Sequence, residues 1–432
     1  MTTLFYGLTK IFHTLKPSTE LKTKTEYNKM RFTTKLLPSL SGNIGVIQLN
    51  HPKALNALAM DMIDCFTDTL DQWYHPSNQQ VRCILIKGVD REPDATPDKR
   101  KPVFCAGGDV KAMYESRKSQ PGQHGQGQEG LATADFFRKE YNIDYRLATS
   151  KQIPQISIWN GVVMGGGAGI SVHGKYRVAT EHSLFAMPET ALGLFPDVGS
   201  FYWMPRILKG GLPAYIALTG HRLKAEDLLY TGIATHYVQS QDLDNLERSL
   251  VDASMITDSA LSDPYAAVLM KFHEIPPTDP RSSVLATHRP MIDEVFSIRD
   301  DKESKTMEDI MAKLQQLSDE KHDFASQTLG TLQKMSPTSL KITLEGLKRG
   351  AKVKTIGEDL QMEFRLSQAC TRNEDSDFME GVRAILVDKD RNPKWNPATL
   401  EEVTDEMVEA FFGPVEHEWV IPKPTDPVTS KL

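Results

Sequence analysis

Short apolar runs rich in β-branched residues alternate with amphipathic segments through the middle of the chain. Residues 45–50 (GVIQLN) and 82–87 (RCILIK) have the length and composition of buried strands. Between them, apolar side chains recur every three or four positions from Ala59 to Trp73, which predicts a helix with one apolar face packed on the core. This alternation of strands and helices is typical of a layered α/β fold.

A second set of predicted strands indicates how the fold repeats. Residues 153–159, 176–179 and 183–187 are short and mostly apolar, and a glycine-rich helix start lies between the first two. The repeating unit is therefore strand, strand, helix. The segments 88–100 and 116–130 are rich in Gly, Pro, Gln and charged residues, which favours surface loops or insertions.

Helical patterns predominate after about residue 264. An amphipathic stretch covers 307–332, and a further helix is predicted over 337–349. These helices are expected to form a second unit packed on the core. We divide the chain into four parts: a basic N-terminal targeting or disordered segment (1–42), a catalytic core (43–263), a mainly helical region (264–420) and a C-terminal tail (421–432).

Composition and charge narrow the class of protein. The 432 residues exceed one ordinary domain, and 40% hydrophobic with 25% charged residues is typical of a soluble globular protein. A formal net charge of -7 gives no excess of Lys and Arg for binding a phosphate backbone, so we expect no direct contact with nucleic acid. No apolar run reaches the roughly 18 residues of a membrane-spanning helix, so we expect no membrane insertion.

The cysteines and histidines show no metal-binding or disulfide pattern. The four cysteines lie far apart and form no C-x-x-C pair, which favours reduced thiols in an intracellular compartment: Cys65, Cys83, Cys105 and Cys370. The 12 histidines form no H-x-x-x-H or H-E-x-x-H cluster, so no metal is expected.

The two ends of the chain carry possible targeting signals. The first 42 residues hold seven basic residues against two acidic ones, which suits a mitochondrial presequence or a disordered basic tail. The chain ends in Ser430-Lys431-Leu432, a tripeptide that directs import into peroxisomes when it is exposed at the C-terminus. We therefore expect the mitochondrion, the peroxisome, or both.

Two glycine-rich segments each follow a predicted strand and open a helix. In residues 104–111 (FCAGGDVK), paired glycines let backbone N–H groups approach a ligand, and Asp109 is placed to cap the helix. A tight turn before a capped helix would also explain this segment. Residues 164–169 (MGGGAG) place free N–H groups at a helix start, but lack the P-loop and dinucleotide-binding patterns. Together, two such amide donors could form an oxyanion hole.

A third segment carries two carboxylates in apolar surroundings. Residues 185–199 (FAMPETALGLFPDVG) contain Glu189 and Asp197 in a loop punctuated by Pro and Gly. Burial near apolar side chains raises the pKa of a carboxyl, and two carboxyls in one pocket can divide base and acid work between them. A purely structural alternative is that Glu189 starts a helix and Asp197 caps the helix predicted over 201–208.

Motifs spread over residues 40–405 resemble one known family. Their order and spacing are similar to those of the crotonase superfamily, and within it to the 3-hydroxyisobutyryl-CoA hydrolase branch. The motifs are HPKALNAL (51–58), FCAGGDV (104–110), FFRKEY (136–141), GVVMGGGAG (161–169), MPETALGLFPDVG (187–199), ALTGHRL (217–223) and EGVRAILVDKD (380–390).

The resemblance implies a ClpP/crotonase-like fold of repeated ββα units with a C-terminal helical region. It implies that Gly108 and Gly166 supply the oxyanion-hole amides, and that coenzyme A bends across the glycine-rich helix start as part of an acyl-CoA substrate, with no separate cofactor. It also implies that Glu140 lies near the substrate together with Glu189 and Asp197. The match of Glu140 to the family requires a one-residue shift in the segment that follows it.

The resemblance also bears on the reaction. Hydratases of the superfamily carry a glutamate at the position of Gly169, and glycine cannot move a proton. The resemblance therefore implies hydrolysis of the thioester of a short 3-hydroxyacyl-CoA in valine catabolism, with Glu189 and Asp197 as catalytic residues. The substrate is 3-hydroxyisobutyryl-CoA or 3-hydroxypropionyl-CoA, and the sequence does not choose between them. An enoyl-CoA hydratase or isomerase and a structural protein associated with the mitochondrial ribosome remain the alternatives, and self-association into a homo-oligomer stays open.

Overall fold

The computed structural model describes most of the chain. The described residues are 31–37, 43–75, 77–78, 80–91, 101–119, 132–151, 153–253, 263–298 and 305–422. Both predicted targeting signals lie largely outside these ranges. So do residues 92–100 and 120–131, which make up most of the two predicted surface loops.

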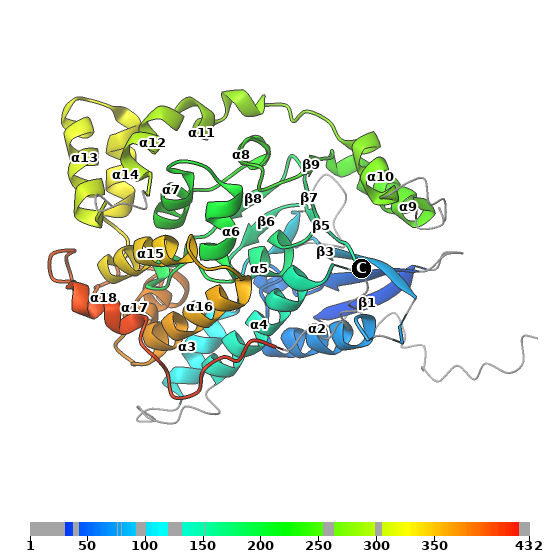
Figure 1. Ribbon diagram of the computed structural model, residues 1–432, viewed down its shortest axis with the longest axis horizontal. Coiled ribbons are helices and arrows are strands. Elements are labelled where there is room, and N and C mark those ends of the chain that lie inside the picture. The colour runs from blue at the N-terminus through cyan, green and yellow to red at the C-terminus, as the bar shows by residue number, and fades with distance from the viewer. Residues whose placement is uncertain are drawn as a thin grey trace, which may run out of the picture.

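A six-stranded sheet forms the centre of the fold (Figure 1). Its strands, in spatial order, are β1 (Phe32–Leu37), β2 (Asn43–Leu49), β3 (Val81–Gly88), β5 (Gln155–Trp159), β7 (Tyr176–Ala179) and β9 (His236–Tyr237). β1 runs antiparallel to β2, and every other pair is parallel. The strands predicted around residues 45–50, 82–87, 153–159 and 176–179 are thus confirmed.

A second, smaller sheet contains β4 (Val103–Cys105), β6 (Val162–Met164) and β8 (Leu184–Ala186), all parallel. Each repeat places its first strand (β3, β5 or β7) in the large sheet and its second (β4, β6 or β8) in the small one, and helical turns follow. The helices before and between these strands are η1 (Pro52–Ala54), α2 (Met60–Trp73), α3 (Val110–Lys118), α4 (Ala132–Thr149) and α5 (Gly166–Val172). This arrangement confirms the predicted ββα repeat.

The two faces of the large sheet are covered by different helices. Side chains alternate along β2, so that Ile44 and Val46 lie on one face whereas Ile47 and Leu49 lie on the other. The first face packs against α9 (Leu243–Ala253) and α10 (Pro264–Phe272), and the second belongs to the main core with α2, α4 and α5. Apart from the antiparallel edge strand β1, which is largely exposed, the sheet is therefore buried on both sides, as parallel sheets are.

The remaining helices complete the molecule and include the predicted C-terminal helical region. The amphipathic stretch 307–332 is divided into two helices that pack against each other, α13 (Met307–Asp319) and α14 (Asp323–Leu332). The others are η3 (Glu189–Leu192), α6 (Ser200–Ile207), α7 (Leu212–Thr219), α8 (Ala225–Thr231), η4 (Ser240–Asp242), η5 (Pro280–Ser282), α11 (Val284–Thr287), α12 (Arg289–Phe296), α15 (Pro337–Gly350), α16 (Ile356–Thr371), α17 (Asp377–Val382), the π-helix η6 (Arg383–Val387) and α18 (Asp405–Phe411).

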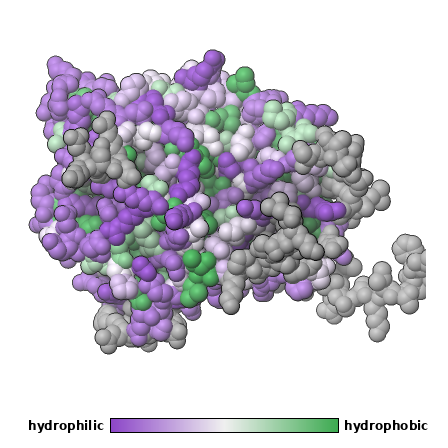
Figure 2. Space-filling model, viewed as in Figure 1, coloured by the Kyte–Doolittle hydropathy of each residue, from purple (hydrophilic) through white to green (hydrophobic). Residues whose placement is uncertain are grey.

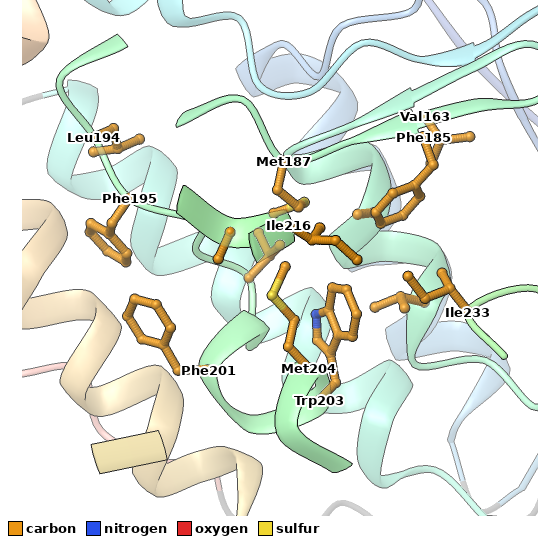
Figure 3. Packing of buried hydrophobic residues seen from close by; sticks show 14 of the residues in the cluster. Val163, Phe185, Met187, Leu194, Phe195, Phe201, Trp203, Met204, Ile216 and Ile233 are labelled. Carbon is orange, nitrogen blue, oxygen red and sulfur yellow. The ribbon is translucent and has the colours of Figure 1, made fainter. Parts of the chain in front are cut away.

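The helical region shares one core with the sheets. A Cβ at Gly346 or Gly350 of α15 would overlap the ring or the carbonyl of Phe201 in α6, so these glycines allow the two helices to meet closely. Phe201 in turn stacks on Phe195, with ring centroids 5.6 Å apart (Figure 3). The helical region is therefore built into the core rather than attached to its surface.

The structure differs from the sequence division at two places. Phe32–Leu37, assigned to the N-terminal segment, forms β1 and pairs with β2. α10, assigned to the helical region, covers one face of the sheet through Tyr265 and Leu269. In addition, α3 extends to Lys118, into the segment predicted as a loop.

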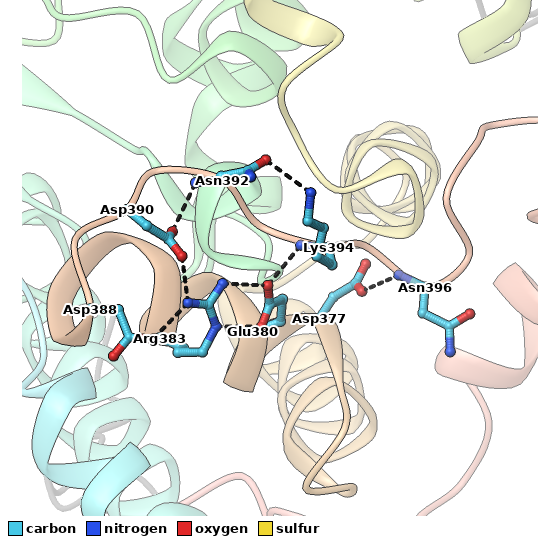
Figure 4. Close-up of polar contacts among 8 residues, drawn as sticks. All are labelled: Asp377, Glu380, Arg383, Asp388, Asp390, Asn392, Lys394 and Asn396. Atoms are coloured by element: carbon cyan, nitrogen blue, oxygen red, sulfur yellow. Dashed lines mark hydrogen bonds and ion pairs between the residues drawn. The ribbon is translucent and has the colours of Figure 1, made fainter.

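The loop after η6 is held against α17 by charged side chains (Figure 4). Arg383 pairs with three carboxylates at 2.7–2.8 Å, those of Glu380, Asp388 and Asp390. The backbone N–H groups of Lys394 and Asn396 donate to Glu380 and Asp377, at 2.7 and 2.8 Å. These contacts fix the loop after η6 onto α17, which packs against η3.

The outer surface is mostly polar on the face shown in Figure 2. Large exposed hydrophobic residues in the described part of the chain come from separate elements: Leu36, Met270, Ile275, Val284, Met407 and Val420. Isolated apolar residues of this kind are normal on globular proteins. Among the described helices, none combines the length and the apolar character needed to cross a bilayer.

Candidate active site

Three of the predicted site residues follow the strands of the small sheet, at one edge of it. Because β4, β6 and β8 are parallel, their carboxyl ends lie at the same edge. Gly108 comes shortly after β4, Gly166 after β6 and Glu189 after β8. The repeat of the fold thus brings together three segments that are far apart in the sequence.

The backbone amides of Gly108 and Gly166 lie close to each other. Leu58 makes backbone hydrogen bonds of 2.8 and 2.9 Å to the residues on either side of Gly108, so the N–H of Gly108 itself points away from Leu58. Gly166 opens α5, where the first N–H groups have no acceptor within the helix. A Cβ at Gly166 would lie 3.3 Å from Gly108 N and would overlap Glu140 Oε1. A side chain at position 166 would therefore occupy the space beside Gly108 N and Glu140.

Glu189 is the first residue of η3, and its side chain reaches the glycine turn before α5. The residue is 5% exposed, and its Oε1 lies 2.9 Å from where a Cβ on Gly165 would be. Its Oε2 has no hydrogen-bond partner among the described residues. Burial, and secondly the charge of Asp197, raise the pKa of Glu189 well above the ordinary value. A carboxyl with a raised pKa suits proton transfer near neutral pH.

Asp197 lies in a strained loop between η3 and α6. Val198, the next residue, has a φ of 56°, a conformation that is unusual for a β-branched side chain. The Tyr141 hydroxyl donates to Asp197 Oδ2 at 3.0 Å. Burial raises the pKa of Asp197 to about 7, although the hydrogen bond from Tyr141 acts in the opposite direction. The helix that follows is capped at Gly199, so the alternative in which Asp197 is the cap of that helix is wrong.

Glu140 enters the site from α4, which packs on α5. The residue is 2% exposed, and its Oε1, which has no partner in the described part of the chain, lies over Gly166. Burial first, and then the charges of Asp197, Asp144 and Glu189, raise the pKa of Glu140 well above its usual value. The site therefore gathers four carboxyl groups with no adjacent cation in these contacts.

The position of Gly169 is closed to a side chain. A Cβ at Gly169 would lie 2.6 Å from Val198 Cβ and 2.8 Å from Asp144 Oδ1. The loop of Asp197 and a carboxyl from α4 thus fill the space into which a residue at this position would project. Any larger residue at this position would require both neighbours to move.

A second buried carboxyl pair, which the sequence did not reveal, holds the Asp197 loop from α16. Glu363 accepts hydrogen bonds from the N–H groups of Gly199 at 2.6 Å and Phe201 at 3.3 Å, and Asp359 accepts one from Tyr202 N–H at 2.8 Å. Both carboxyls are fully buried. They satisfy the free N–H groups at the start of α6, so the helical region fixes the loop that carries Asp197.

The comparison with protein families agrees with this geometry. A family described as "Enoyl-CoA hydratase/isomerase" matches residues 44–412 of the chain. The chain belongs to the enoyl-CoA hydratase/isomerase family. The fold of repeated ββα units with a C-terminal helical region is therefore the crotonase fold of this family.

Individual members of the family resemble the chain over most of its length. The "3-hydroxyisobutyryl-CoA hydrolase, mitochondrial" of Gallus gallus is 42% identical over 375 residues, 87% of each chain. The protein of the same name in Rattus norvegicus is 41% identical over 402 residues, 93% of this chain and 94% of the relative. Among solved structures, a carnitinyl-CoA dehydratase from Mycobacterium thermoresistibile is 33% identical with a TM-score of 0.73, covering 89% of this chain and 98% of its own.

The five residues predicted for the site lie in one region, although they come from four separate segments: Gly108, Glu140, Gly166, Glu189 and Asp197. Sequence reasoning missed three residues around them: Tyr141, Asp144 and Glu363. Only Tyr141 had a signal, because it lies within a motif of the family. In the described ranges, no group of three His, Cys, Asp or Glu residues is arranged to hold a metal ion.

Proposed function

We propose that this protein is an acyl-CoA thioester hydrolase that converts 3-hydroxyisobutyryl-CoA to free coenzyme A and 3-hydroxyisobutyrate. One observation carries this assignment: relatives that match 85–93% of the chain at 41–43% identity bear the name 3-hydroxyisobutyryl-CoA hydrolase. The closed position of Gly169 supports it, because a hydratase-type glutamate has no room there. Coenzyme A is part of the substrate, and the reaction needs no further cofactor.

In the proposed reaction, Glu189 takes a proton from water while the water oxygen forms a bond to the thioester carbonyl carbon. The N–H groups of Gly108 and Gly166 bind the resulting oxyanion. These donors stabilise the negative charge that develops on the carbonyl oxygen in the transition state. When the intermediate collapses, the carbon–sulfur bond breaks and Glu189 returns the proton to the sulfur of coenzyme A. The products are the carboxylic acid and the thiol.

A second route to the same products uses Glu189 as the nucleophile. Its carboxylate would attack the thioester carbonyl carbon and form an anhydride as the carbon–sulfur bond breaks and coenzyme A leaves as the thiolate, and water then hydrolyses the anhydride. Single turnover in water labelled with oxygen-18 tests this route. Label in Glu189 establishes an anhydride that water opens at the Glu189 carbonyl, whereas label only in the released acid shows that water attacked the acyl carbon.

Asp197 and Glu140 complete the substrate site. The Tyr141 hydroxyl holds Asp197 in place through a hydrogen bond. Asp197 in turn accepts a hydrogen bond from the 3-hydroxyl group of the acyl chain. Glu140, which lies over Gly166, contacts the thioester end. A site that hydrogen-bonds a substrate hydroxyl rejects analogues without it by large factors, because its buried polar groups are then left unpaired.

A thiol-trapping assay with 3-hydroxyisobutyryl-CoA beside crotonyl-CoA tests the function. Release of thiol from the hydroxyacyl substrate is expected, with no hydration of crotonyl-CoA. No thiol release from 3-hydroxyisobutyryl-CoA would overturn the assignment. The Glu189→Gln variant tests the alternative of a structural protein. An enzyme should lose activity in this variant while keeping its fold, whereas a role in assembly should survive the change.

The location of this activity is proposed from the two ends of the chain. The basic N-terminus, and the word "mitochondrial" in the names of the relatives, support import into mitochondria. The C-terminal Ser-Lys-Leu supports import into peroxisomes. Residues 1–42 fused to a fluorescent protein should reach mitochondria. A full-length chain labelled at its N-terminus should reach peroxisomes only while Leu432 is present.

A further inference from the structure

Asp144 on α4 is a buried carboxyl to which the proposed reaction gives no role. It is 0% exposed, and neither of its oxygens has a hydrogen-bond partner among the described residues. Burial of a carboxyl without partners costs several kcal/mol in a protein interior, where such groups are normally satisfied. This group therefore calls for an explanation beyond packing.

The register of two helices places Asp144 beside the reacting groups. Glu140 and Asp144 are four residues apart on α4 and project from one face of that helix. Gly166 and Gly169 are three residues apart on α5 and likewise share a face. Glu140 Oε1 lies over Gly166, and Asp144 Oδ1 lies 2.8 Å from where a Cβ on Gly169 would be. Asp144 is thus one helical turn further from the oxyanion amides than Glu140 is.

The neighbour of Asp144 on the other side is the Asp197 loop. Val198 Cβ lies 2.6 Å from the same point next to Gly169, so the loop of Asp197 and the Asp144 carboxyl meet at this glycine. Burial, followed by the charge of Asp197, raises the pKa of Asp144 well above the ordinary value. This shift favours the neutral form of Asp144, in which the carboxyl can donate a hydrogen bond.

We infer that Asp144 and Asp197 together bind the hydroxyl group of the acyl chain, with Asp197 accepting a hydrogen bond from the hydroxyl and Asp144 donating a hydrogen bond to its oxygen. The inference rests on the proposed function and makes Asp144 a residue that determines specificity. A hydroxyl is both a donor and an acceptor, so the pair satisfies it in both senses. An acyl chain without a hydroxyl leaves two buried polar groups unpaired.

The ratio of kcat/KM for 3-hydroxyisobutyryl-CoA to that for isobutyryl-CoA measures this preference, because the two substrates differ only in the hydroxyl. In the wild-type enzyme the ratio should reach about 10⁴. Asp144→Ala should lower the ratio by at least about tenfold, through loss of activity on the hydroxylated substrate alone. Asp144→Asn is the matched control: its amide can still donate to the hydroxyl, so its ratio should stay within about threefold of wild type.

The outcomes separate this inference from the proposed function. An inactive wild-type enzyme would defeat the function itself. An active wild type with an unchanged ratio in Asp144→Ala would overturn the inference alone, as would an equal loss on both substrates, which a purely structural role predicts. Asp144→Ser, whose hydroxyl is too short to replace the carboxyl, gives the same test if the alanine variant does not fold.

Discussion

Replacement of Glu363 by alanine should weaken both the fold and the catalytic loop. In the native structure this side chain accepts two backbone hydrogen bonds, from Gly199 N–H at 2.6 Å and from Phe201 N–H at 3.3 Å. Alanine would leave both buried donors without an acceptor, at about 1–3 kcal/mol each. The expected loss is therefore about 2–6 kcal/mol, a large part of the 5–15 kcal/mol that is typical of a folded protein. Glu363→Gln keeps one acceptor oxygen, so it should cost about half as much.

Urea unfolding measures the loss of stability, and thiol release from 3-hydroxyisobutyryl-CoA measures the effect on the loop. We expect kcat/KM of Glu363→Ala to fall by at least about tenfold, since displacement of reacting groups by about 1 Å can cost up to 10²-fold. Glu358→Ala on the same helix, at an exposed position, is the matched control and should cost at most about 1 kcal/mol. An alanine variant as stable as wild type would refute the hydrogen-bond argument. A destabilised variant with unchanged kcat/KM would show that α16 does not position Asp197.

Three further changes test the site itself. Glu189→Gln should lower kcat/KM by at least about 10²-fold, because it removes the carboxylate that accepts the proton. It should not lower stability in urea, because the carboxyl that it replaces is buried with an unpartnered oxygen. Unchanged turnover would contradict the role of Glu189. Gly166→Ala should lower thiol release by at least about tenfold, since its methyl group would overlap Glu140 Oε1 and displace that carboxyl from the substrate site; wild-type activity in this variant would contradict the close approach of Glu140 to position 166. The kcat/KM for the hydroxylated substrate should rise as pH increases through about 7, because burial raises the pKa of Asp197 to about 7 and the ionised carboxylate is the stronger hydrogen-bond acceptor for the substrate hydroxyl; Asp197→Asn should remove this step, and an unchanged profile in that variant would assign the titration to another group.

The glycine turns and Glu189 could be predicted from the sequence because local patterns specify them. A strand that ends in paired glycines before a helix start defines where N–H groups are exposed, and the parallel repeat then brings two such turns together. Glu189 was singled out because it shares an apolar segment, punctuated by Pro and Gly, with Asp197. Local pattern and the resemblance to the crotonase superfamily together predicted the residues that follow the strands of the small sheet.

The residues that were missed depend on contacts between distant segments. Asp144 shares a helix face with Glu140, but only the packing of α4 on α5 places it next to Gly169. Glu363 lies in a helix with many charged residues, and nothing local distinguishes it from an exposed glutamate. β1 was assigned to a basic tail from the composition of its segment. Its pairing with β2, which the composition does not reveal, makes it part of the sheet. Similarly, the apolar face of α10 does not reveal which surface it covers.

The link from α16 to the start of α6 has a consequence for synthesis of the chain. Domains generally begin to fold from the N-terminus while the rest is still being made. The sheets and α6 emerge before residue 363, so the N–H groups of Gly199 and Phe201 must be solvated by water until α16 arrives. The loop that carries Asp197 is therefore completed late. A product that terminates before α16 would contain every proposed reacting group and still lack the support that holds them in place.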